Sequence, residues 1–230
     1  MKDFEYGDGT AVLYSDAQLQ EHQNKSNAFY LRGGKRLFDI LLAIAILPII
    51  APIVAVLWVI TRMDGGAGFF GHMRVGRDGR KFRCWKVRSM VHGAEEKLKA
   101  YLEANPEAAA EFARDFKLAN DPRITRFGHF IRKTSLDELP QLWNVLRGDM
   151  SFVGPRPVTR PELARYGAQQ WAYVSQRPGI TGIWQVSGRN DVSYDERIRM
   201  DVDYTRRASL MFDAKVIVRT AGAVLGSTGK

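Results

Sequence analysis

Residues 37–60 read LFDILLAIAILPIIAPIVAVLWVI, and this stretch constrains the fold more than any other part of the chain. Its only charged residue is Asp39, close to its beginning. A straight helix of about 24 residues extends about 36 Å, which is enough to cross the apolar core of a bilayer. Length and composition alone therefore predict a membrane helix.

Two prolines in the middle of this stretch argue against a simple crossing. Pro48 and Pro52 each lack an N–H donor and press against the preceding turn, so we expect a bend there. Basic residues also flank both ends of the stretch: Arg32, Lys35 and Arg36 before it, and Arg62, Arg74, Arg77 and Arg80 after it. Because positive flanks favour the cytoplasmic side, we expect a re-entrant helix that bends at the prolines and returns. A kinked span and a buried core helix are the alternatives.

The composition limits the chemistry. The 230 residues carry a formal charge of +9, although residues 1–30 hold two lysines against five acidic residues. The basic excess therefore lies after residue 30, and it favours phosphates, acidic lipid head groups or nucleic acid as partners. The single cysteine, Cys84, excludes an internal disulfide. The four histidines have no metal-binding spacing, and no P-loop or dinucleotide-binding glycine motif is present.

Residues 69–90, FFGHMRVGRDGRKFRCWKVRSM, predict a β-hairpin. Asp78-Gly79 favours a turn, and the runs on either side are rich in aromatic and β-branched residues. Seven cations are interleaved with Phe82 and Trp85: Arg74, Arg77, Arg80, Lys81, Arg83, Lys86 and Arg88. The hairpin could bind nucleic acid, lie on anionic head groups, or line a phosphate site. The neighbouring membrane segment disfavours nucleic acid, and the other two interpretations stay open.

The other segments complete an α+β, mostly helical fold class. Residues 1–30 are polar and aperiodic and predict a loosely ordered arm. Residues 94–118 predict two helices, with Asn105 as cap, Pro106 opening the second helix, and Phe112 and Phe116 packing together. From Ser209 onward the pattern predicts an amphipathic helix that lies at the membrane interface.

The stretch DPRITRFGHFIRKTSLDELPQLWNVLRGDMSFVGPRP, residues 121–157, concentrates the chemistry. It predicts a short helix that ends at Gly148 and buries one face made of Leu139, Leu142, Trp143 and Leu146. Ser135 to Glu138 fits a capping box, so the two carboxylates could serve only the helix. Alternatively, positive potential keeps Asp137 and Glu138 ionised, and an ionised Asp can attack phosphorus or hold Mg²⁺.

Two further segments could hold an anionic ligand. Gly154-Pro155-Arg156-Pro157 presents Arg156 in a stiff, extended segment suited to an oxyanion, unless it is an ordinary proline-rich turn. The glycine-punctuated stretch RPGITGIWQVSGR, residues 177–189, ends in Arg189 and can wrap a nucleotide, unless its glycines only make turns.

Four stretches together, KRLFDILLAI, RVGRDGRKFRCWKVRSM, the 121–157 block and RPGITGIWQVSGR, resemble the bacterial sugar transferase family. These are monotopic phosphoglycosyl transferases, which begin exopolysaccharide and O-antigen assembly. The resemblance runs from about Lys35 to the C-terminal helix and is strongest to galactosyl-1-phosphate transferases. It implies that the first residue of an Asp-Glu pair attacks the β-phosphate of a UDP-sugar and releases UMP. Polyprenyl phosphate, here undecaprenyl phosphate, then takes the sugar phosphate.

Carried onto this sequence, the resemblance makes Asp137 the nucleophile and the Mg²⁺ contact, and gives Glu138 a positioning role. The expected phosphate, nucleotide or substrate contacts are Lys86, Arg88, Arg156, Arg189 and Asp201. Residues 1–30, the polar arm expected from composition, match nothing in the family. For the rest, the resemblance implies a re-entrant membrane helix at 31–62 and a catalytic domain at 63–230 on the cytoplasmic face of the bacterial inner membrane. Galactose is the favoured hexose, a homodimer stays open, and nucleic acid is not expected as a partner. His72, where many relatives have Gln, and Trp85, where relatives often have a smaller residue, depart from the pattern.

Two other functions stay in comparison. A membrane-tethered module would bind acidic lipid or nucleic acid through the basic hairpin without turnover. A scaffold for a polysaccharide complex would capture partners independently of the two carboxylates. The 121–157 block favours the transferase, because a lipid-binding surface does not need that arrangement.

Overall fold

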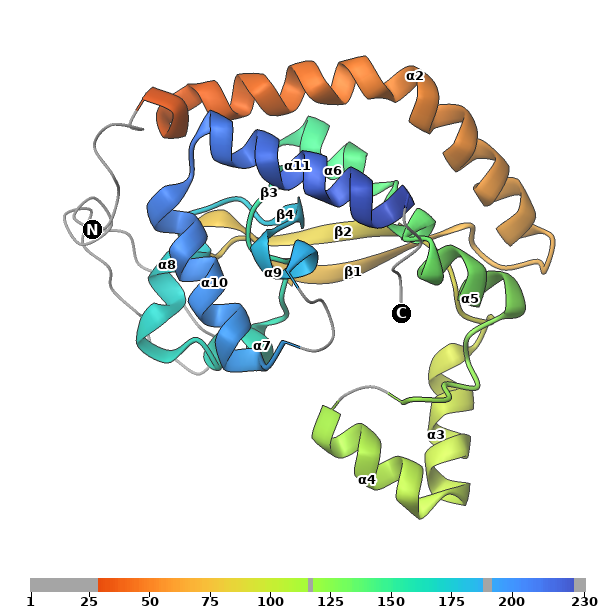
Figure 1. Ribbon diagram of the computed structural model, residues 1–230. Helices are drawn as coiled ribbons and strands as arrows, with labels where there is room; N and C mark the ends of the chain where they lie inside the picture. Colours follow the sequence, from red (N-terminus) through yellow and green to blue (C-terminus); the bar gives the residue numbers. More distant parts are fainter. Residues whose placement is uncertain (1–28, 116–117, 188–191, 226–230) are drawn as a thin grey trace.

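The computed structural model describes residues 29–115, 118–187 and 192–225. Most of the described chain is helical, with two small sheets of two strands each within this part. The α+β, mostly helical fold class is therefore confirmed. In Figure 1 one long helix, α2, arches over a body built around the sheets, and a pair of helices projects on the opposite side. The predicted arm at residues 1–30 lies outside the described residues except for its last two.

Helix α2 spans Lys35–Arg62 and follows a short π-helical turn, η2, at Tyr30–Gly34. Pro48 and Pro52 both lie inside α2, and Figure 1 shows that the helix bends part-way along its length. The stretch Tyr30–Arg62 is long and apolar enough to cross a membrane by length and composition, and only 11% of its most apolar window is buried. The alternative of a buried core helix is therefore wrong.

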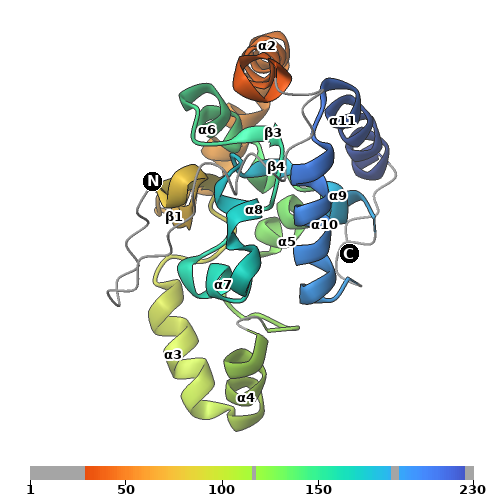
Figure 2. The same cartoon turned by 90° about the vertical axis from the view of Figure 1, so that its left-hand side faces the viewer.

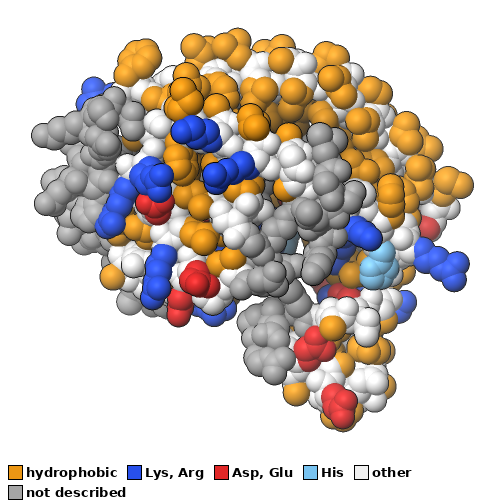
Figure 3. All heavy atoms as spheres, viewed as in Figure 1, with side chains coloured by type: hydrophobic (Ala, Val, Ile, Leu, Met, Phe, Trp, Pro, Cys, Tyr) orange, Lys and Arg blue, Asp and Glu red, His pale blue; other side chains and the backbone are white. Residues whose placement is uncertain are grey.

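Most large apolar side chains of α2 are exposed. They include Leu37, Leu41, Ile44, Leu47, Ile49, Ile53, Val56, Trp58, Val59 and Ile60. Figure 3 shows apolar side chains gathered along the edge of the molecule that α2 forms. Exposed apolar surface this extensive is unfavourable in water and marks a surface that contacts lipid or another apolar partner.

A buried ion pair attaches the start of α2 to the rest of the protein. The Lys35 ammonium pairs with Asp213, whose side chain is fully buried in helix α11, Leu210–Leu225. Tyr30 and Tyr204 donate hydrogen bonds of 2.6 Å and 2.9 Å to the two Asp213 carboxylate oxygens. Lys35 also donates to the Val153 carbonyl at 2.9 Å. Every strong polar atom of this ion pair has a partner, which burial of charge requires.

The predicted hairpin is confirmed. Strands β1, Phe69–Val75, and β2, Lys81–Val87, are antiparallel with Phe70 opposite Lys86. The turn between them holds Asp78 and Gly79 at φ values of +58° and +71°, a left-handed conformation that Asp tolerates and Gly adopts freely. One face of β2 packs into a core with α2 and helix α6, Gln141–Arg147; this core contains Ala43, Phe82, Cys84, Leu142, Val145 and Met150.

The predicted helix pair is also confirmed, as α3, Ala94–Ala104, and α4, Pro106–Asp115. The Asn105 side chain donates to the Tyr101 carbonyl at 2.8 Å, and its own carbonyl accepts from the Ala109 N–H. Figures 1 and 2 show the two helices projecting from the body. The predicted contact between Phe112 and Phe116 lies outside the described residues.

Two expectations for the 121–157 block are wrong. Ser135 has a left-handed φ of +57° and no side-chain capping bond, so the capping box does not form. Trp143 is 57% exposed, and α6 instead buries Gln141, Leu142, Asn144 and Val145. The face differs because α6 packs against both α2 and β2, and the Asn144 amide pairs with the backbone of β2. Gly148, at a φ of +89°, ends α6 as predicted.

Two short parallel strands that the sequence did not predict form the second sheet. Strand β3, Ser151–Val153, pairs with β4, Gly179–Thr181. The surrounding elements are α5 (Arg126–Lys133), η4 (Leu136–Glu138), α7 (Arg160–Ala164), η5 (Gly167–Gln169), α8 (Gln170–Val174), α9 (Ile183–Val186) and α10 (Tyr194–Arg207). The C-terminal helix α11 is confirmed, and its position at a membrane interface stays a prediction.

The buried ion pair generates a first prediction. Lys35→Met leaves the Asp213 charge buried without its cation, and we expect it to cost about 3–5 kcal/mol. The double variant Lys35→Met/Asp213→Asn removes the stranded charge and should regain part of this loss. Thermal unfolding of the detergent-purified protein measures both, with Lys97→Met on the exposed α3 as control. A double variant less stable than Lys35→Met would contradict the ion-pair account.

Candidate active site

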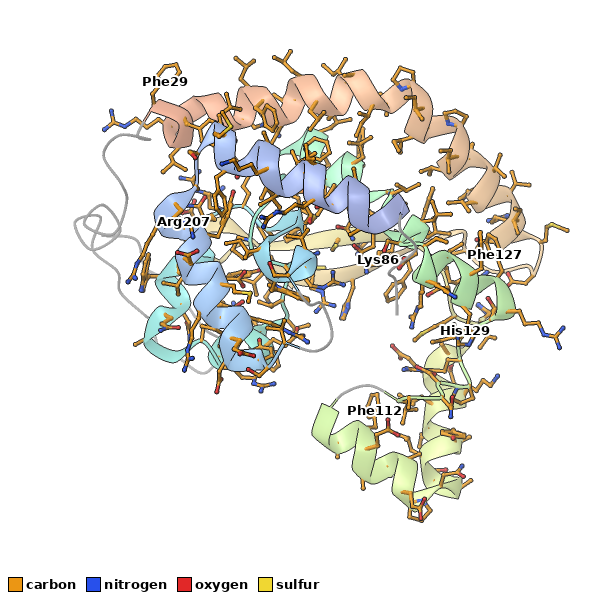
Figure 4. All side chains as sticks on the ribbon, in the orientation of Figure 1. Phe29, Lys86, Phe112, Phe127, His129 and Arg207 are labelled. Atoms are coloured by element: carbon orange, nitrogen blue, oxygen red, sulfur yellow. The ribbon has the colours of Figure 1, made fainter. Side chains whose placement is uncertain are left out.

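Two cationic side chains from different segments meet at one carboxylate of a third segment. The Lys86 ammonium of β2 donates to Glu138 Oε1 at 2.7 Å, and the Arg156 guanidinium donates to the same oxygen at 3.0 Å. Lys86, Glu138 and Arg156 were all predicted from the sequence, and the structure brings them together. Figure 4 labels Lys86 on the hairpin.

Asn144 holds the hairpin and the two-carboxylate segment in register. Its side chain accepts from the Trp85 N–H at 3.0 Å and donates to the Arg83 carbonyl at 2.8 Å. This amide is fully buried and replaces the backbone partner that a third strand would supply. As a result, Lys86 in β2 lies next to η4, which immediately precedes α6. The sequence reading missed Asn144, because a single asparagine in a helix pattern gives no signal of its partner.

The left-handed Ser135 directs the chain from α5 into η4. Helix α5 ends at Lys133 with Thr134 as its cap, and Ser135 turns the backbone so that Leu136–Glu138 forms one tight 3₁₀ turn. Left-handed backbone costs free energy for a residue other than glycine and is often found at functional sites. Here the left-handed Ser135 lets both Asp137 and Glu138 face Lys86.

Asp137 is placed differently from Glu138. Its Oδ2 lies 3.8 Å from the Lys86 ammonium, and the residue is only 7% exposed. Within the described part of the chain, no group donates a hydrogen bond to its carboxylate. A carboxylate that is buried but not engaged in hydrogen bonds retains its lone pairs for an incoming electrophile.

The same surroundings move the two carboxyl pKa values in opposite directions. Burial raises the pKa of Asp137, the neighbouring Glu138 charge raises it further, and Lys86, Arg132 and Arg156 only partly offset this. Burial would also raise the pKa of Glu138, but Arg156 and Lys86 overcome it and lower this pKa to about 2. Glu138 is therefore ionised at neutral pH, whereas the pKa of Asp137 is raised rather than lowered, because burial outweighs the local positive charge.

Three of the nearby cations have other partners. Arg123 forms a bidentate pair with Asp121, at 2.8 Å and 2.6 Å. Arg132 donates to Ser89 Oγ at 2.8 Å. Arg88 was predicted to contact phosphate or nucleotide, but the structure places it at the C-terminal end of α2. There its guanidinium donates to Asp64 and to the carbonyls of Thr61, Ala67 and Met90.

Asp201, a further predicted contact, is not part of the group around Glu138. It is buried in α10, accepts a 2.7 Å hydrogen bond from Tyr166, and has a pKa raised by burial to about 7. Its hydrogen-bond partner among the described residues is thus a tyrosine hydroxyl and not a cation. Arg189 lies outside the described residues.

The carboxylates present fit a Mg²⁺ ion that takes its other oxygen ligands from the substrate and from water. No cluster of three or more His, Cys, Asp or Glu residues exists in the described ranges. Two adjacent carboxylates do occur, and Mg²⁺ is commonly held by one or two carboxylates together with substrate phosphates and water. Asp137 is the better candidate ligand, since Lys86 and Arg156 already engage one Glu138 oxygen.

A family model described as bacterial sugar transferase matches residues 30–227. The chain is 50% identical over 97% of its length to a UDP-galactose-lipid carrier transferase of Erwinia amylovora. It is also 50% identical over 96% of its length to an undecaprenyl-phosphate galactose phosphotransferase of Salmonella typhimurium. These matches cover 47% of each of those relatives, so the chain spans about half their length.

A third relative has a length closer to that of this chain. The exopolysaccharide production protein ExoY of Rhizobium meliloti is 44% identical over 85% of the chain and 87% of the relative. The family match and these identities leave no ambiguity about kinship. The chain belongs to the bacterial sugar transferase family.

The opposite pKa shifts predict opposite stability effects. The ionised form of Asp137 is disfavoured in the folded protein, so this residue costs stability increasingly as the pH rises above the ordinary Asp pKa. Asp137→Asn should therefore raise the melting temperature, and more at pH 8 than at pH 4. Each 1 kcal/mol corresponds to about 2–4 °C for a chain of this size.

Glu138→Gln is the matched variant. Glu138 adds stability above its ordinary pKa and loses it only as the pH falls toward 2, so its removal should lower the melting temperature at pH 7. Thermal unfolding in one detergent over a pH series measures both variants. Equal shifts of the same sign in the two variants would disprove the assignment of Asp137 as the strained carboxylate and Glu138 as the stabilised one.

Proposed function

We propose that the protein transfers a hexose-1-phosphate, with galactose favoured, from a UDP-sugar to undecaprenyl phosphate and so initiates exopolysaccharide synthesis. The observation that carries the proposal is the contrast between the two adjacent carboxylates. Glu138 is neutralised by Lys86 and Arg156, whereas Asp137 is buried beside the same cations without a hydrogen bond from the described residues. Capping a helix requires no such arrangement.

In the first step of this proposal, Asp137 attacks the donor. A carboxylate oxygen forms a bond to the β-phosphorus while the bond from that phosphorus to the bridging oxygen breaks. UMP leaves with the bonding electrons, and the sugar phosphate stays on Asp137 as an acyl phosphate. Lys86 and Arg156 lie where the negative charge on the phosphoryl oxygens develops, and fixed cations at such a place stabilise the transition state.

In the second step, an oxygen of undecaprenyl phosphate attacks the same phosphorus. The bond to the Asp137 oxygen breaks, the carboxylate is restored, and the product is undecaprenyl diphosphate sugar. No net proton is required, because both nucleophiles are anions and both leaving groups are anions. Glu138, ionised at neutral pH, holds the two cations in place during both steps.

When bound, Mg²⁺ would shield the charge of the donor diphosphate from the incoming anion. Asp137 would be its main protein ligand, with Glu138 as the neighbouring carboxylate. Lys86 and Arg156, both paired with Glu138, would contact the phosphate oxygens of the donor. Removal of the metal by EDTA should therefore stop turnover.

For the membrane, we propose that α2 is re-entrant and that the active site faces the cytoplasm. The exposed apolar side chains of α2 supply the lipid-facing surface, and the prolines inside the helix supply the bend. Basic residues at both ends favour the same side of the membrane. Undecaprenyl phosphate, whose long tail stays in the bilayer, would then reach Asp137 from the membrane surface.

Galactose is the favoured sugar because two relatives at 50% identity are named for galactose or UDP-galactose. To test this, protein in nanodiscs with undecaprenyl phosphate and Mg²⁺ receives a panel of UDP-sugars, and UMP release is followed. We expect release with UDP-galactose, a loss of at least about 10³-fold in Asp137→Asn, and a loss with EDTA. Release that persists in Asp137→Asn would exclude the covalent mechanism. A folded wild-type protein that releases no UMP from any donor would exclude the transferase.

The topology has its own test. Single cysteines replace Phe29 or Met63, which are exposed at the two ends of α2, and whole cells are treated with a membrane-impermeant maleimide. Cys84 is buried, so the background is low. A re-entrant helix predicts no labelling at either site. In a Pro48→Ala/Pro52→Ala background we expect the Phe29→Cys site to become labelled, because a straighter helix can span. Labelling of that site with the prolines intact would rule out re-entry.

A further inference from the structure

Trp184 connects the group around Glu138 to a second arginine. Its indole ring is 8% exposed and lies 5.9 Å from the Arg156 guanidinium and 4.6 Å from the Arg197 guanidinium. Arg197 comes from the first turn of α10 and Trp184 from α9. Two guanidinium groups on one buried indole are held at a defined separation, because each gains cation–π attraction from the same ring.

The second sheet places Trp184 beside Arg156. The Gly154 N–H donates to the Thr181 carbonyl at 3.0 Å, and the Gly179 N–H donates to the Pro155 carbonyl at 2.8 Å. A Cβ on Gly182 would lie 2.5 Å from the Gly154 carbonyl oxygen, so the two chains approach as closely as glycine allows. The segment carrying Arg156 and the segment carrying Trp184 are thus fixed side by side.

The two arginines differ in how their charge is balanced. Arg156 is paired with Glu138 at 3.0 Å. Arg197 donates to the Val192 carbonyl at 3.1 Å, and no carboxylate of the described residues lies within ion-pair distance of it. Two guanidinium groups on one ring repel each other, and an anion bound between them would relieve this repulsion. The arrangement therefore suits a phosphate that bridges the two cations.

The position of this arginine pair favours a water-soluble phosphate over a lipid phosphate. In both Figure 1 and Figure 2, α9 and α10 lie on the far side of β3 and β4 from α2. The exposed apolar surface of α2 is where a lipid tail would be accommodated. A phosphate bound between Arg156 and Arg197 would lie away from that surface and is better matched to the nucleotide.

We propose that Arg197 binds the phosphate of the nucleoside monophosphate part of the donor, and that Trp184 positions Arg197 and Arg156 for it. This inference rests on the proposed transfer from a UDP-sugar. Lys86 then contacts the transferred phosphoryl group, Arg156 contacts both phosphates of the donor, and Arg197 contacts the phosphate that leaves with UMP. Since Arg197 contacts the same group in donor and product, it contributes to binding of both more than to the chemical step.

The test uses the full chain in nanodiscs and calorimetric titration with UMP, with farnesyl phosphate as the lipid-phosphate probe. Arg197→Gln should raise the dissociation constant for UMP at least about tenfold and leave that for farnesyl phosphate within twofold. The exposed Arg199, on the same helix, supplies the matched control Arg199→Gln, which should change neither. In UMP-release kinetics, Arg197→Gln should raise KM for the UDP-sugar by a similar factor with kcat changed less than threefold.

Each outcome decides the inference. An unchanged UMP dissociation constant in Arg197→Gln, or no UMP binding by the wild type, overturns it. Weakened binding of farnesyl phosphate alone would assign the arginine to the lipid phosphate and also overturns it. If the wild type releases no UMP from any donor but Arg197→Gln weakens UMP binding, the transferase proposal fails and the nucleotide subsite stands.

The role of Trp184 needs a conservative pair of variants. Trp184→Phe keeps an aromatic face and should retain UMP affinity within about threefold of the wild type. Trp184→Leu keeps an apolar side chain but removes the ring, and it should weaken UMP binding about as much as Arg197→Gln. Thermal unfolding establishes that both variants are folded. Equal UMP affinity in the two variants would exclude positioning by the aromatic ring.

Discussion

The Glu138 carboxylate, shared between Lys86 and Arg156, is the interaction on which the site depends. It joins the hairpin, the turn that carries Asp137, and the proline-flanked segment after β3. Both cations donate to one Glu138 oxygen, and neither donates a hydrogen bond to Asp137, whose Oδ2 lies 3.8 Å from the Lys86 ammonium. The arrangement therefore gives two neighbouring carboxylates different surroundings: Glu138 is paired with two cations, and Asp137 is buried without a hydrogen bond from the described residues.

This separation works against stability. A buried carboxylate with a raised pKa and no hydrogen bond from the described residues is less stable in the folded chain than in water, and the rest of the fold must compensate. Compensation comes from contacts that hold the turn from outside. The fully buried Asn144 fixes α6 to β2. Close to the turn, Arg123 is held by Asp121 and Arg132 by Ser89. Active sites commonly combine such local strain with a rigid surround.

The same logic applies to the attachment of α2. Its exposed apolar side chains gain little from the rest of the protein, so the attachment relies on buried polar contacts near its N-terminal end. Lys35 pairs with Asp213, and Asp39 accepts hydrogen bonds from Ser151 Oγ and the Phe152 N–H at 3.0 Å and 3.1 Å. At the other end, Arg88 binds the Thr61 carbonyl and Asp64. The basic hairpin that the sequence suggested as a ligand surface thus uses one of its cations to hold the helix.

The sequence by itself determined the elements whose signal is local. The apolar run of α2, the Asp78-Gly79 turn, the break at Asn105-Pro106, the stop at Gly148, and the candidates Asp137, Glu138 and Arg156 follow from residue types at short spacing. Lys86 was singled out among the hairpin cations only by the resemblance to the family. Only the tertiary structure decided that Ser135 turns left-handed, that Trp143 faces outward, that Arg88 holds α2, and that Trp184 brings Arg197 to Arg156. Those outcomes depend on burial and on partners that are distant in the chain, as in the pairing of Arg88 with Asp64, 24 residues away. Periodicity and spacing along the chain do not reveal these distant partners or which residues are buried. The free energy that decides both arises only when distant segments pack together and exclude water.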